Sequence, residues 1–346
     1  MLNSVDAFMA TMVPQTPPIT IDLALALGRE RFGFEASVVR LSGERDENFK
    51  LTTRDGAEYV LKVANSAEHP AVADLLTAAL LHLERTDPTL PCPRVVRELN
   101  GGTRIRFADE SGCERTARML TYLPGRLLVT TPRSQRQRAA CGRLGGTLSH
   151  ALRSFEHPAQ HRAIIWDVRY AGHMWRLLEQ LPGFAFRPVV AGLLTRIVPQ
   201  IDSRLPHLRH QVVHNDLNPL NVLVASTDET RISGIIDFGD LTYTALIADV
   251  AIAAAELIPP DCTQAAGARG CVLDVVRAYH ERMSLWEQEL ALLGVLVAAR
   301  LIMNVVVHEW HVHHNPSNSH HAALDPDFMR ARLEIAGRLL REDFTL

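Results

Sequence analysis

Two short runs of this sequence carry polar side chains between apolar segments. The first run is HNDLNPLNVLV at 214–224, and the second is GIIDFGD at 234–240. Short hairpin strands are expected to hold the polar groups on rigid stems, and to bring Asp237 beside Asn221. The strand-like flanking segments are 211–213, 222–224 and 232–236.

The polar groups of these runs match the needs of phosphoryl transfer. Transfer from a nucleotide requires a group that orients the acceptor hydroxyl, and oxygen ligands that hold magnesium against the phosphates. Asp216 fits the first role, and Asn221 and Asp237 fit the second. Each run alone is a common turn or strand end, but the two together, in this order and spacing, favour a kinase catalytic centre.

Composition bounds the class of protein. With 346 residues, 47% of them hydrophobic, the chain is expected to fold into two compact units. The formal net charge of -3 and the pI near 6.6 provide no basic field, so neither nucleic acid nor membrane is an expected partner. The most apolar run, 290–307, is interrupted by Arg300 and Asn304, which favours a buried helix in a soluble protein. Oligomeric state is left open.

The cysteines favour a reducing compartment. They are five in number, scattered, and without a Cys-x-x-Cys pair, which argues against a disulfide framework or a zinc site. The N-terminus has no basic segment followed by an apolar stretch. We therefore expect a cytoplasmic protein. The cysteines are Cys92, Cys113, Cys141, Cys262 and Cys271.

Lysine is rare in this chain. Of its 36 basic residues only Lys50 and Lys62 are lysine, and Lys62 lies in the alternating strand EYVLKVA. A compact ammonium on a slim stem can reach nucleotide phosphates, so Lys62 is a candidate phosphate ligand. The alternative is a solvated lysine on a strand.

The first third of the chain reads as a small antiparallel sheet with helices. Residues 1–18, with three prolines, form an expected flexible lead, and 19–123 an N-terminal lobe. The Asp55-Gly56 turn supports a three-stranded meander, and Asn100-Gly101-Gly102 supports a later hairpin between its flanking strands. The expected helices are 19–32 and 71–84, the latter opened by Pro70; the expected strands are 37–41, 49–53, 58–64, 94–98, 103–107 and 113–123.

The rest of the chain reads as helical. Pro124-Gly125 breaks the strand pattern, and from about residue 134 only the two catalytic hairpins depart from helix. The C-terminal lobe is therefore expected at 124–346. The fold class is α+β: a bilobal, protein-kinase-like fold with an N-terminal antiparallel sheet, one main helix and a larger, mostly helical C-terminal lobe.

At this point the chain resembles a family, the aminoglycoside phosphotransferase superfamily with its protein-kinase-like fold. The Asp-Phe-Gly-Asp ending at Asp240 is typical of that branch, and LSGERDENF at 41–49, EYVLKVAN at 58–65 and HHNPSN at 313–318 resemble the hydroxylysine kinase group. The resemblance implies that Asp216 is the catalytic aspartate, that Asn221 and Asp237 bind Mg²⁺, and that Lys62 binds the α- and β-phosphates.

The resemblance also implies nucleotide contacts outside these groups. Residues from Gly43 to Asn48 would form the loop over the phosphates, with one glycine where protein kinases have three, so fewer backbone amides would contact the phosphates. Residues 119–123 would be the connector that binds the nucleobase through its backbone, chiefly at Thr121 and Leu123. An interior strand would show the same pattern.

Three further positions follow from the resemblance. Asp249 would brace the catalytic loop from the start of a helix, and His214 would be a packed core histidine rather than a proton carrier. Related kinases pair the strand lysine with a glutamate on the next helix, but Leu76 occupies that position here. Asp74 and Glu68 are the nearest carboxylates in the sequence.

Two stretches are candidates for acceptor binding. Arg300 and Asn304, with His308, recur every four residues on an apolar helix, and Arg300 could bind a carboxylate. Trp166 could stack over a substrate amine that Asp167 neutralises. The alternatives are that Asp167 caps a helix and that Arg300 pairs with a buried acid. Six histidines near the C-terminus fit a solvated helix end better than a metal site.

These observations predict a kinase that transfers the γ-phosphate of ATP or GTP to a hydroxyl of a small amine or amino acid, with a hydroxylysine-like acceptor favoured. Aminoglycoside, choline, ethanolamine and homoserine acceptors stay open. A catalytically silent pseudokinase that binds nucleotide is the competing class. The missing helix glutamate favours the silent class, whereas intact Asp216, Asn221 and Asp237 weigh against it.

Overall fold

The structure, a computed structural model, describes residues 17–43, 45–262, 264–314 and 324–344, together with Asp6, Met9 and Leu346. It divides into two compact units. The first comprises Met1–Leu123 and Glu156–Ala163, and the second comprises Pro124–Phe155 and Ile164–Leu346. The segment at 156–163, expected in the C-terminal lobe, thus clusters with the first unit. Most of the expected lead at 1–18 lies outside the described residues.

The first unit is built on a six-stranded antiparallel sheet, with β1, β2, β3, β6 and β4 in that order and β5 also paired to β6. The predicted meander forms β1 to β3, and Gly56 takes a positive φ of 85° in its second turn, a conformation that suits glycine. The strands are β1 Ala36–Leu41, β2 Glu47–Thr53, β3 Glu58–Val63, β4 Val95–Val96, β5 Ile105–Ala108 and β6 Glu114–Thr121.

The predicted hairpin around Asn100-Gly101-Gly102 is wrong. The turn itself forms, because Glu98 N donates to Gly102 O at 2.7 Å. The strands that flank it do not pair with each other, however; β4 pairs with Leu120 and Met119 of β6, and β5 pairs further along the same strand. Because β3 occupies the other edge of β6, the turn moves the chain along one edge.

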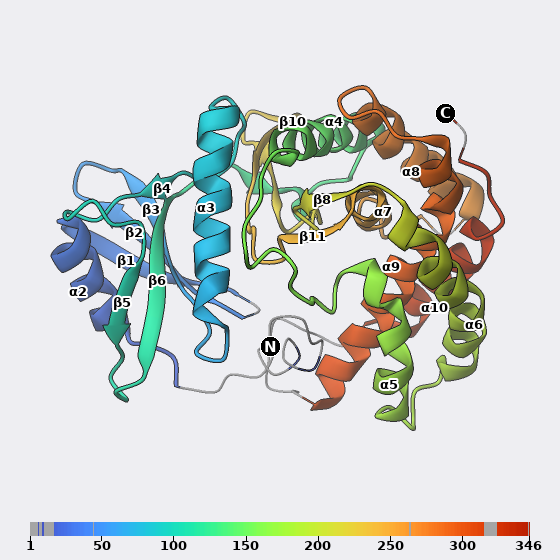
Figure 1. The fold of residues 1–346 in the computed structure, drawn as a ribbon, viewed down its shortest axis with the longest axis horizontal. Coiled ribbons are helices and arrows are strands. Elements are labelled where there is room, and N and C mark those ends of the chain that lie inside the picture. The colour runs from blue at the N-terminus through green and yellow to red at the C-terminus, as the bar shows by residue number, and fades with distance from the viewer. Residues whose placement is uncertain are drawn as a thin grey trace. The chain divides into compact units, whose positions relative to one another are not determined.

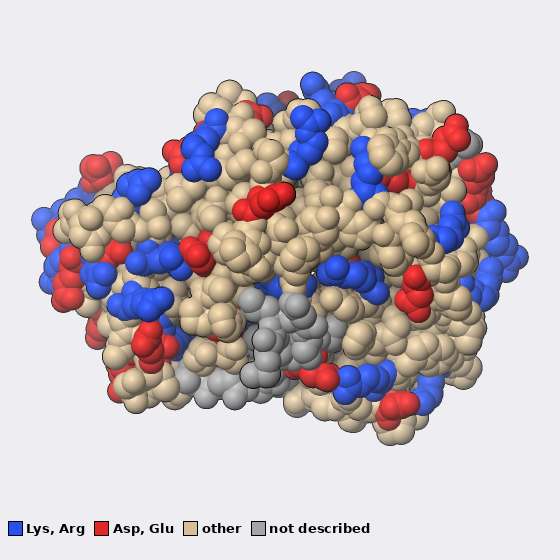
Figure 2. Space-filling view, in the orientation of Figure 1, with Lys and Arg blue, Asp and Glu red and all other residues tan. Residues whose placement is uncertain are grey.

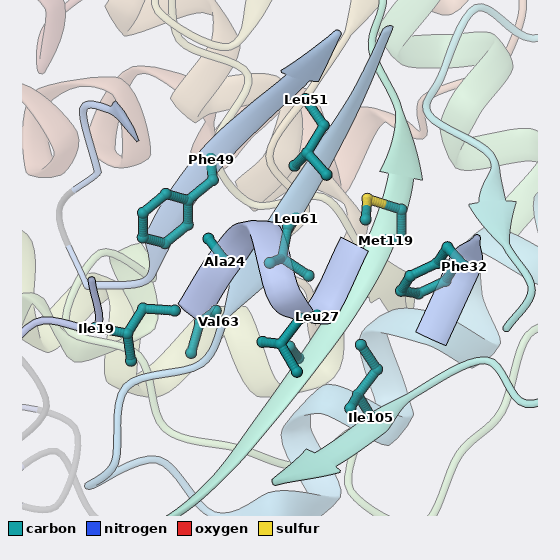
Figure 3. Packing of buried hydrophobic residues seen from close by; sticks show 11 residues of the cluster. Ile19, Ala24, Leu27, Phe32, Phe49, Leu51, Leu61, Val63, Ile105 and Met119 are labelled. Atoms are coloured by element: carbon teal, nitrogen blue, oxygen red, sulfur yellow. The ribbon is translucent and has the colours of Figure 1, made fainter. Parts of the chain in front are cut away.

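Two helices, α2 (Ile21–Phe32) and α3 (Pro70–Thr86), lie on opposite faces of this sheet (Figure 1). The hydroxyl of Thr20 caps the start of α2, and Gly33 ends it with a φ of 73°. Apolar side chains of α2 meet Phe49 and Leu61 of the sheet in a buried core (Figure 3), and burying each such side chain contributes about 1.5–3 kcal/mol.

The second unit is mainly helical, with two small sheets. One sheet has the order β10-β9-β7, and the other pairs β11 with β8. The α-helices are α4 Gln135–Leu152, α5 Met174–Glu179, α6 Arg187–Arg204, α7 Leu246–Glu256, α8 Ala265–His280, α9 Glu287–His314 and α10 Pro326–Leu339, and the short 3-10 helices are η1 Leu128–Thr130, η2 Val168–His173 and η3 Leu205–His207. The strands are β7 Arg126–Leu127, β8 His210–Val213, β9 Val222–Ala225, β10 Asp228–Ile235 and β11 Thr242–Ala245.

The strands around the catalytic runs pair differently from the prediction in one respect. β9 and β10 form the expected hairpin, with Val222 opposite Ile235. β8 does not pair with β9; it pairs with β11, which follows the DFGD run and was not predicted. Each catalytic run is therefore held at both ends by strands.

Helix α9 is the long apolar helix of the second unit. It contains the predicted buried run at 290–307, and its neighbours are α5, α6, α7 and α10. By length and composition it could cross a membrane, but 89% of its most apolar 18-residue window is buried inside the protein, as in the core helix of a soluble protein. On the face drawn in Figure 2, basic and acidic side chains are interspersed.

Candidate active site

The loop between β8 and β9 carries Asp216 on a constrained backbone. Asn215 takes a positive φ of 65°, and its N–H donates to the Asp249 carboxylate at 2.7 Å. Asp249 is fully buried in α7 and also accepts from the Ser149 hydroxyl at 3.2 Å. This is the bracing geometry expected of Asp249, and it fixes the direction in which the next residue, Asp216, leaves the loop.

Both carboxylate oxygens of Asp216 are held by neighbouring side chains. Oδ2 accepts from the amides of Asn218 at 2.9 Å and Asn221 at 2.7 Å. Oδ1 accepts from the Arg300 guanidinium at 3.0 Å. A carboxylate offers about four lone pairs, so one on Oδ1 has no donor among the described side chains with hydrogen bonds to Asp216. An acceptor hydroxyl can donate there.

Asp216 also has an unusual ionisation equilibrium. Burial raises its pKa to about 7, while the Arg300 guanidinium opposes that rise. The carboxylates of Asp240 and Glu256 raise the pKa further. A catalytic carboxylate near neutral pKa can both accept a proton and release it.

Asn221 and Asp237 lie side by side, as the motif spacing predicted. Ile236 N donates to Asn221 O at 2.8 Å, which joins the ends of the β9–β10 hairpin. Asp237 follows with a φ of 57° and is solvent-exposed, and Gly239 N donates to its Oδ1 at 3.0 Å. Such a positive φ is rare outside glycine and is associated with functional sites.

The chemistry of these two groups fits magnesium. Asn221 directs its NH₂ to Asp216, so its carbonyl oxygen faces away and can act as a ligand. Mg²⁺ prefers one or two protein oxygens completed by phosphate oxygens and water. The residues that the structure describes contain no cluster of three His, Cys, Asp or Glu groups that could hold a metal, as expected if phosphates complete the shell.

His214 is a packed residue. It is fully buried, it lies edge-on to Phe238 with ring centroids 4.8 Å apart, and its Nδ1 accepts from Asp216 N at 3.3 Å. Burial lowers its pKa to about 4, so it stays neutral at physiological pH. A neutral histidine supports the loop but carries no proton there.

In the first unit, Lys62 points to the sheet face opposite the α2 core. Its neighbours Leu61 and Val63 belong to that core, and alternation along a strand turns Lys62 the other way. Cross-strand register places it between Asn48 of β2 and Arg118 of β6, and all three are buried. Arg118 was not singled out in the sequence.

The carboxylates near this face have other cations as partners. Leu76 is buried in α3, and Asp74 pairs with Arg104 at 2.9 Å. Glu68 pairs with Arg162 at 3.0 Å, and burial raises its pKa although that arginine lowers it. Arg162 comes from the segment at 156–163, which explains why this segment clusters with the first unit.

The expected phosphate loop is tightly folded. A Cβ on Gly43 would lie 2.3 Å from Asp46 O, so no other residue fits there without a backbone shift. The Asn48 amide donates to Ser42 O at 3.2 Å, which ties the ends of the loop together. Asn48 thus shapes the loop, whereas the sequence had marked it as a nucleotide ligand.

The expected connector begins where β6 ends. Thr121 N donates to Arg94 O at 2.9 Å, and its hydroxyl accepts from Arg94 N at 2.9 Å. A nucleobase could therefore meet Thr121 only at its carbonyl oxygen. Leu123, the last residue of the first unit, lies outside the strand and is half-buried.

The structure corrects the expected acceptor residues on α9. Arg300 is 3% exposed and donates to Asp216, to Glu256 Oε1 at 2.7 Å and to Trp166 O at 2.9 Å. Asn304 donates to Glu256 Oε1 at 2.9 Å. Arg300 is thus paired with buried acids, the stated alternative, and is not free to bind a substrate carboxylate. Trp166 stacks against this guanidinium, 5.1 Å from its ring centroid.

The expectation for Asp167 is wrong for a similar reason. Its side chain has no exposed surface, caps η2 by accepting from Arg169 N at 2.9 Å, and pairs with the Arg169 guanidinium at 3.0 Å. A fully buried capping residue cannot meet a substrate amine. Among the C-terminal histidines, His311 is buried rather than solvated, and His320 and His321 lie outside the described residues.

Two groups of this site had escaped the sequence analysis. Asn218 holds the catalytic carboxylate, and its signal was its position two residues after Asp216. Glu256, at the end of α7, holds Arg300. Its sequence neighbours are apolar, and nothing in that pattern indicates a partner 44 residues away.

A loop carboxylate, an amide and a second carboxylate on strand hairpins define the class of protein-kinase-like phosphotransferases. The family model described as the phosphotransferase enzyme family matches residues 37–312. The chain therefore belongs to that family. It is a phosphotransferase that acts on a hydroxyl group of a small molecule, with a nucleotide as the phosphate donor.

Individual relatives agree with this assignment. Hydroxylysine kinase of Mus musculus is 30% identical over 259 residues, which are 68% of this chain and 68% of that protein. Hydroxylysine kinase of Danio rerio is 31% identical over 235 residues, 64% and 65% of the two chains. Homoserine kinase of Zymomonas mobilis is 24% identical over 296 residues, 83% and 85%. The matches span about two thirds of the hydroxylysine kinases.

Solved structures share the fold. An amicoumacin kinase in complex with AMP-PNP and Ca²⁺ has a TM-score of 0.70 at 17% identity, covering 93% of this chain and 96% of that chain. A microcompartment-associated aminopropanol kinase has a TM-score of 0.63 at 16% identity, with 93% and 95% covered. These likenesses establish the bilobal kinase-like α+β fold predicted from the sequence.

Proposed function

We propose that this chain transfers the γ-phosphate of ATP or GTP to a hydroxyl of a small amine or amino acid, with hydroxylysine-like compounds as the favoured acceptors. The observation that carries this proposal is the geometry of Asp216, whose Oδ1 keeps one lone pair for an acceptor hydroxyl. The acceptor class is supported by the hydroxylysine kinases among the relatives.

Each group of the site has a role in this proposal. Asp216 orients the hydroxyl and takes its proton as the bond to phosphorus forms. Asn221 and Asp237 hold Mg²⁺, which when bound neutralises charge on the phosphates. Lys62 binds the donor phosphates, the loop from Gly43 to Asn48 covers them, and the connector backbone at Thr121 and Leu123 reads the base. The five free thiols suit a reducing compartment such as the cytoplasm.

An acceptor screen tests the function. Purified protein is incubated with ATP or GTP and Mg²⁺ and with hydroxylysine, homoserine, amino alcohols or aminoglycosides, and nucleoside diphosphate release is followed. Hydroxylysine is expected to give the highest kcat/KM. Transfer only to acceptors without an amino group would contradict the proposal.

The role of Asp216 is tested by substitution. Asp216→Ala is expected to lower kcat by about 10²–10⁴-fold, the range for loss of a catalytic base, while nucleotide affinity stays within a few fold. Calorimetric titration of nucleotide accompanies the rate assay. Asp202→Ala, an exposed position on α6, is the matched control and should turn over normally. Full turnover of Asp216→Ala would refute the role.

A further inference from the structure

Arg300 makes an unusual set of contacts for a residue on an apolar helix. Three different nitrogens of its guanidinium have three different partners: Nη2 contacts Asp216 Oδ1, Nε contacts Glu256 Oε1, and Nη1 contacts Trp166 O. The partners come from the catalytic loop, the end of α7 and the segment before η2. Because the guanidinium is planar and rigid, three anchors fix it completely.

This fixed cation acts on the oxygen that remains open to substrate. Both amides, of Asn218 and Asn221, contact Oδ2, whereas Arg300 contacts Oδ1. The direction of the last Oδ1 lone pair is therefore set by Arg300. A rotation of the carboxylate about its Cβ–Cγ bond would break a charge-assisted hydrogen bond, which is about twice as strong as a neutral one.

We propose that Arg300 is a positioning residue for the phosphoryl transfer: it holds the Asp216 carboxylate in the plane that presents one Oδ1 lone pair to the acceptor hydroxyl. It does not contact the acceptor. This inference rests on the proposed function and adds to it a residue 84 positions from the catalytic loop. Glu256 and Asn304 have the supporting task, since both bond to the same Oε1 chain of contacts that anchors Arg300.

Steady-state kinetics of Arg300→Met and Arg300→Lys test the proposal. For Arg300→Met, kcat should fall about 10²-fold, the order expected for misplacing a reacting group by about 1 Å. The KM for acceptor and the Kd for nucleotide should stay within about threefold, because uniform binding is untouched. Arg300→Lys should recover only part of kcat, since an ammonium keeps the charge but cannot make the three planar contacts.

Two further measurements separate positioning from folding. Arg300→Met leaves Glu256 without its cation, so the double variant Arg300→Met/Glu256→Gln removes that charge as well. In Arg300→Ala, added methylguanidinium should restore part of kcat, and ammonium at equal concentration should not. The matched control is Arg209→Met: Arg209 binds Glu289 of the same helix at 2.6 Å, and its loss should reduce stability but leave kcat unchanged.

The outcomes are distinct. If Arg300 bound substrate, Arg300→Met would raise KM for hydroxylysine but not for its decarboxylated analogue, 1,5-diamino-2-pentanol, and kcat would stay normal. Either that pattern, or a folded double variant with wild-type kcat, overturns the positioning role while the kinase assignment stands. Absence of transfer by the wild-type protein, measured first in the same assay, would instead overturn the proposed function.

Discussion

Asp249 is a carboxylate with no exposed surface, held in α7 by two uncharged donors, the backbone N–H of Asn215 and the hydroxyl of Ser149. Burial raises its pKa from 3.8 to about 6, although both hydrogen bonds lower it. The hydrogen bonds direct the catalytic loop, and the buried charge is the energetic cost of that control.

The pH dependence of folding should report this cost. A folded-state pKa above the unfolded one gives stability that is complete below the unfolded value and lost as pH rises through about 6. Asp249→Asn does not titrate, so relative to wild type it should gain up to about 3 kcal/mol of unfolding free energy between pH 4 and 7. Urea denaturation at several pH values measures it. A difference that is constant with pH would contradict the assignment.

At the scale of elements, the contact between α4 and α8 depends on small residues. Cβ atoms added to Gly142 and Gly146 of α4 would lie 2.2 Å from Val275 O and 2.7 Å from Tyr279 O of α8. The helices therefore approach backbone to backbone, which no larger side chain permits. Because α4 also supplies Ser149 to Asp249, this packing supports the catalytic loop.

Gly142→Ala should test that contact. The added methyl meets backbone rather than a movable side chain, so we expect a loss of about 1–3 kcal/mol in unfolding free energy, the usual cost of overpacking. Denaturant unfolding at neutral pH is the measurement. Gly192→Ala on exposed α6 is the control, since nothing lies within 4 Å of its Cβ position, and it should gain up to about 1 kcal/mol. Equal effects of the two substitutions would show that the close approach does not matter.

For the whole molecule, binding of the donor should be linked to stability through the metal. A ligand that binds only the folded state stabilises it by about 2.7 kcal/mol at a concentration one hundred times its Kd. The metal groups, Asn221 and Asp237, are oxygen donors on one hairpin and need phosphate oxygens to complete a magnesium shell. Metal and nucleotide should therefore stabilise the protein together more than separately.

Asp237→Ala should remove this synergy. In thermal unfolding, wild-type protein should gain more from nucleotide with Mg²⁺ than from nucleotide with EDTA, and the variant should show similar, smaller gains in both. Asp228→Ala is the control, because Asp228 lies on the same hairpin and caps its turn by accepting from Thr230 N at 2.9 Å. A variant that keeps the full magnesium effect would exclude Asp237 as a ligand.

The sequence by itself determined the local elements and the catalytic chemistry. The meander, the helices α2, α3 and α9, and the neighbouring positions of Asn221 and Asp237 followed from periodicity, turn residues and short spacing, because their contacts lie close in sequence. Tertiary structure alone decided the partners of long-range groups. β8 paired with β11, Asp167 turned inward, and Arg300 bound Asp216, because a buried charge takes whichever partner the packed fold brings to it, and local sequence does not record that choice.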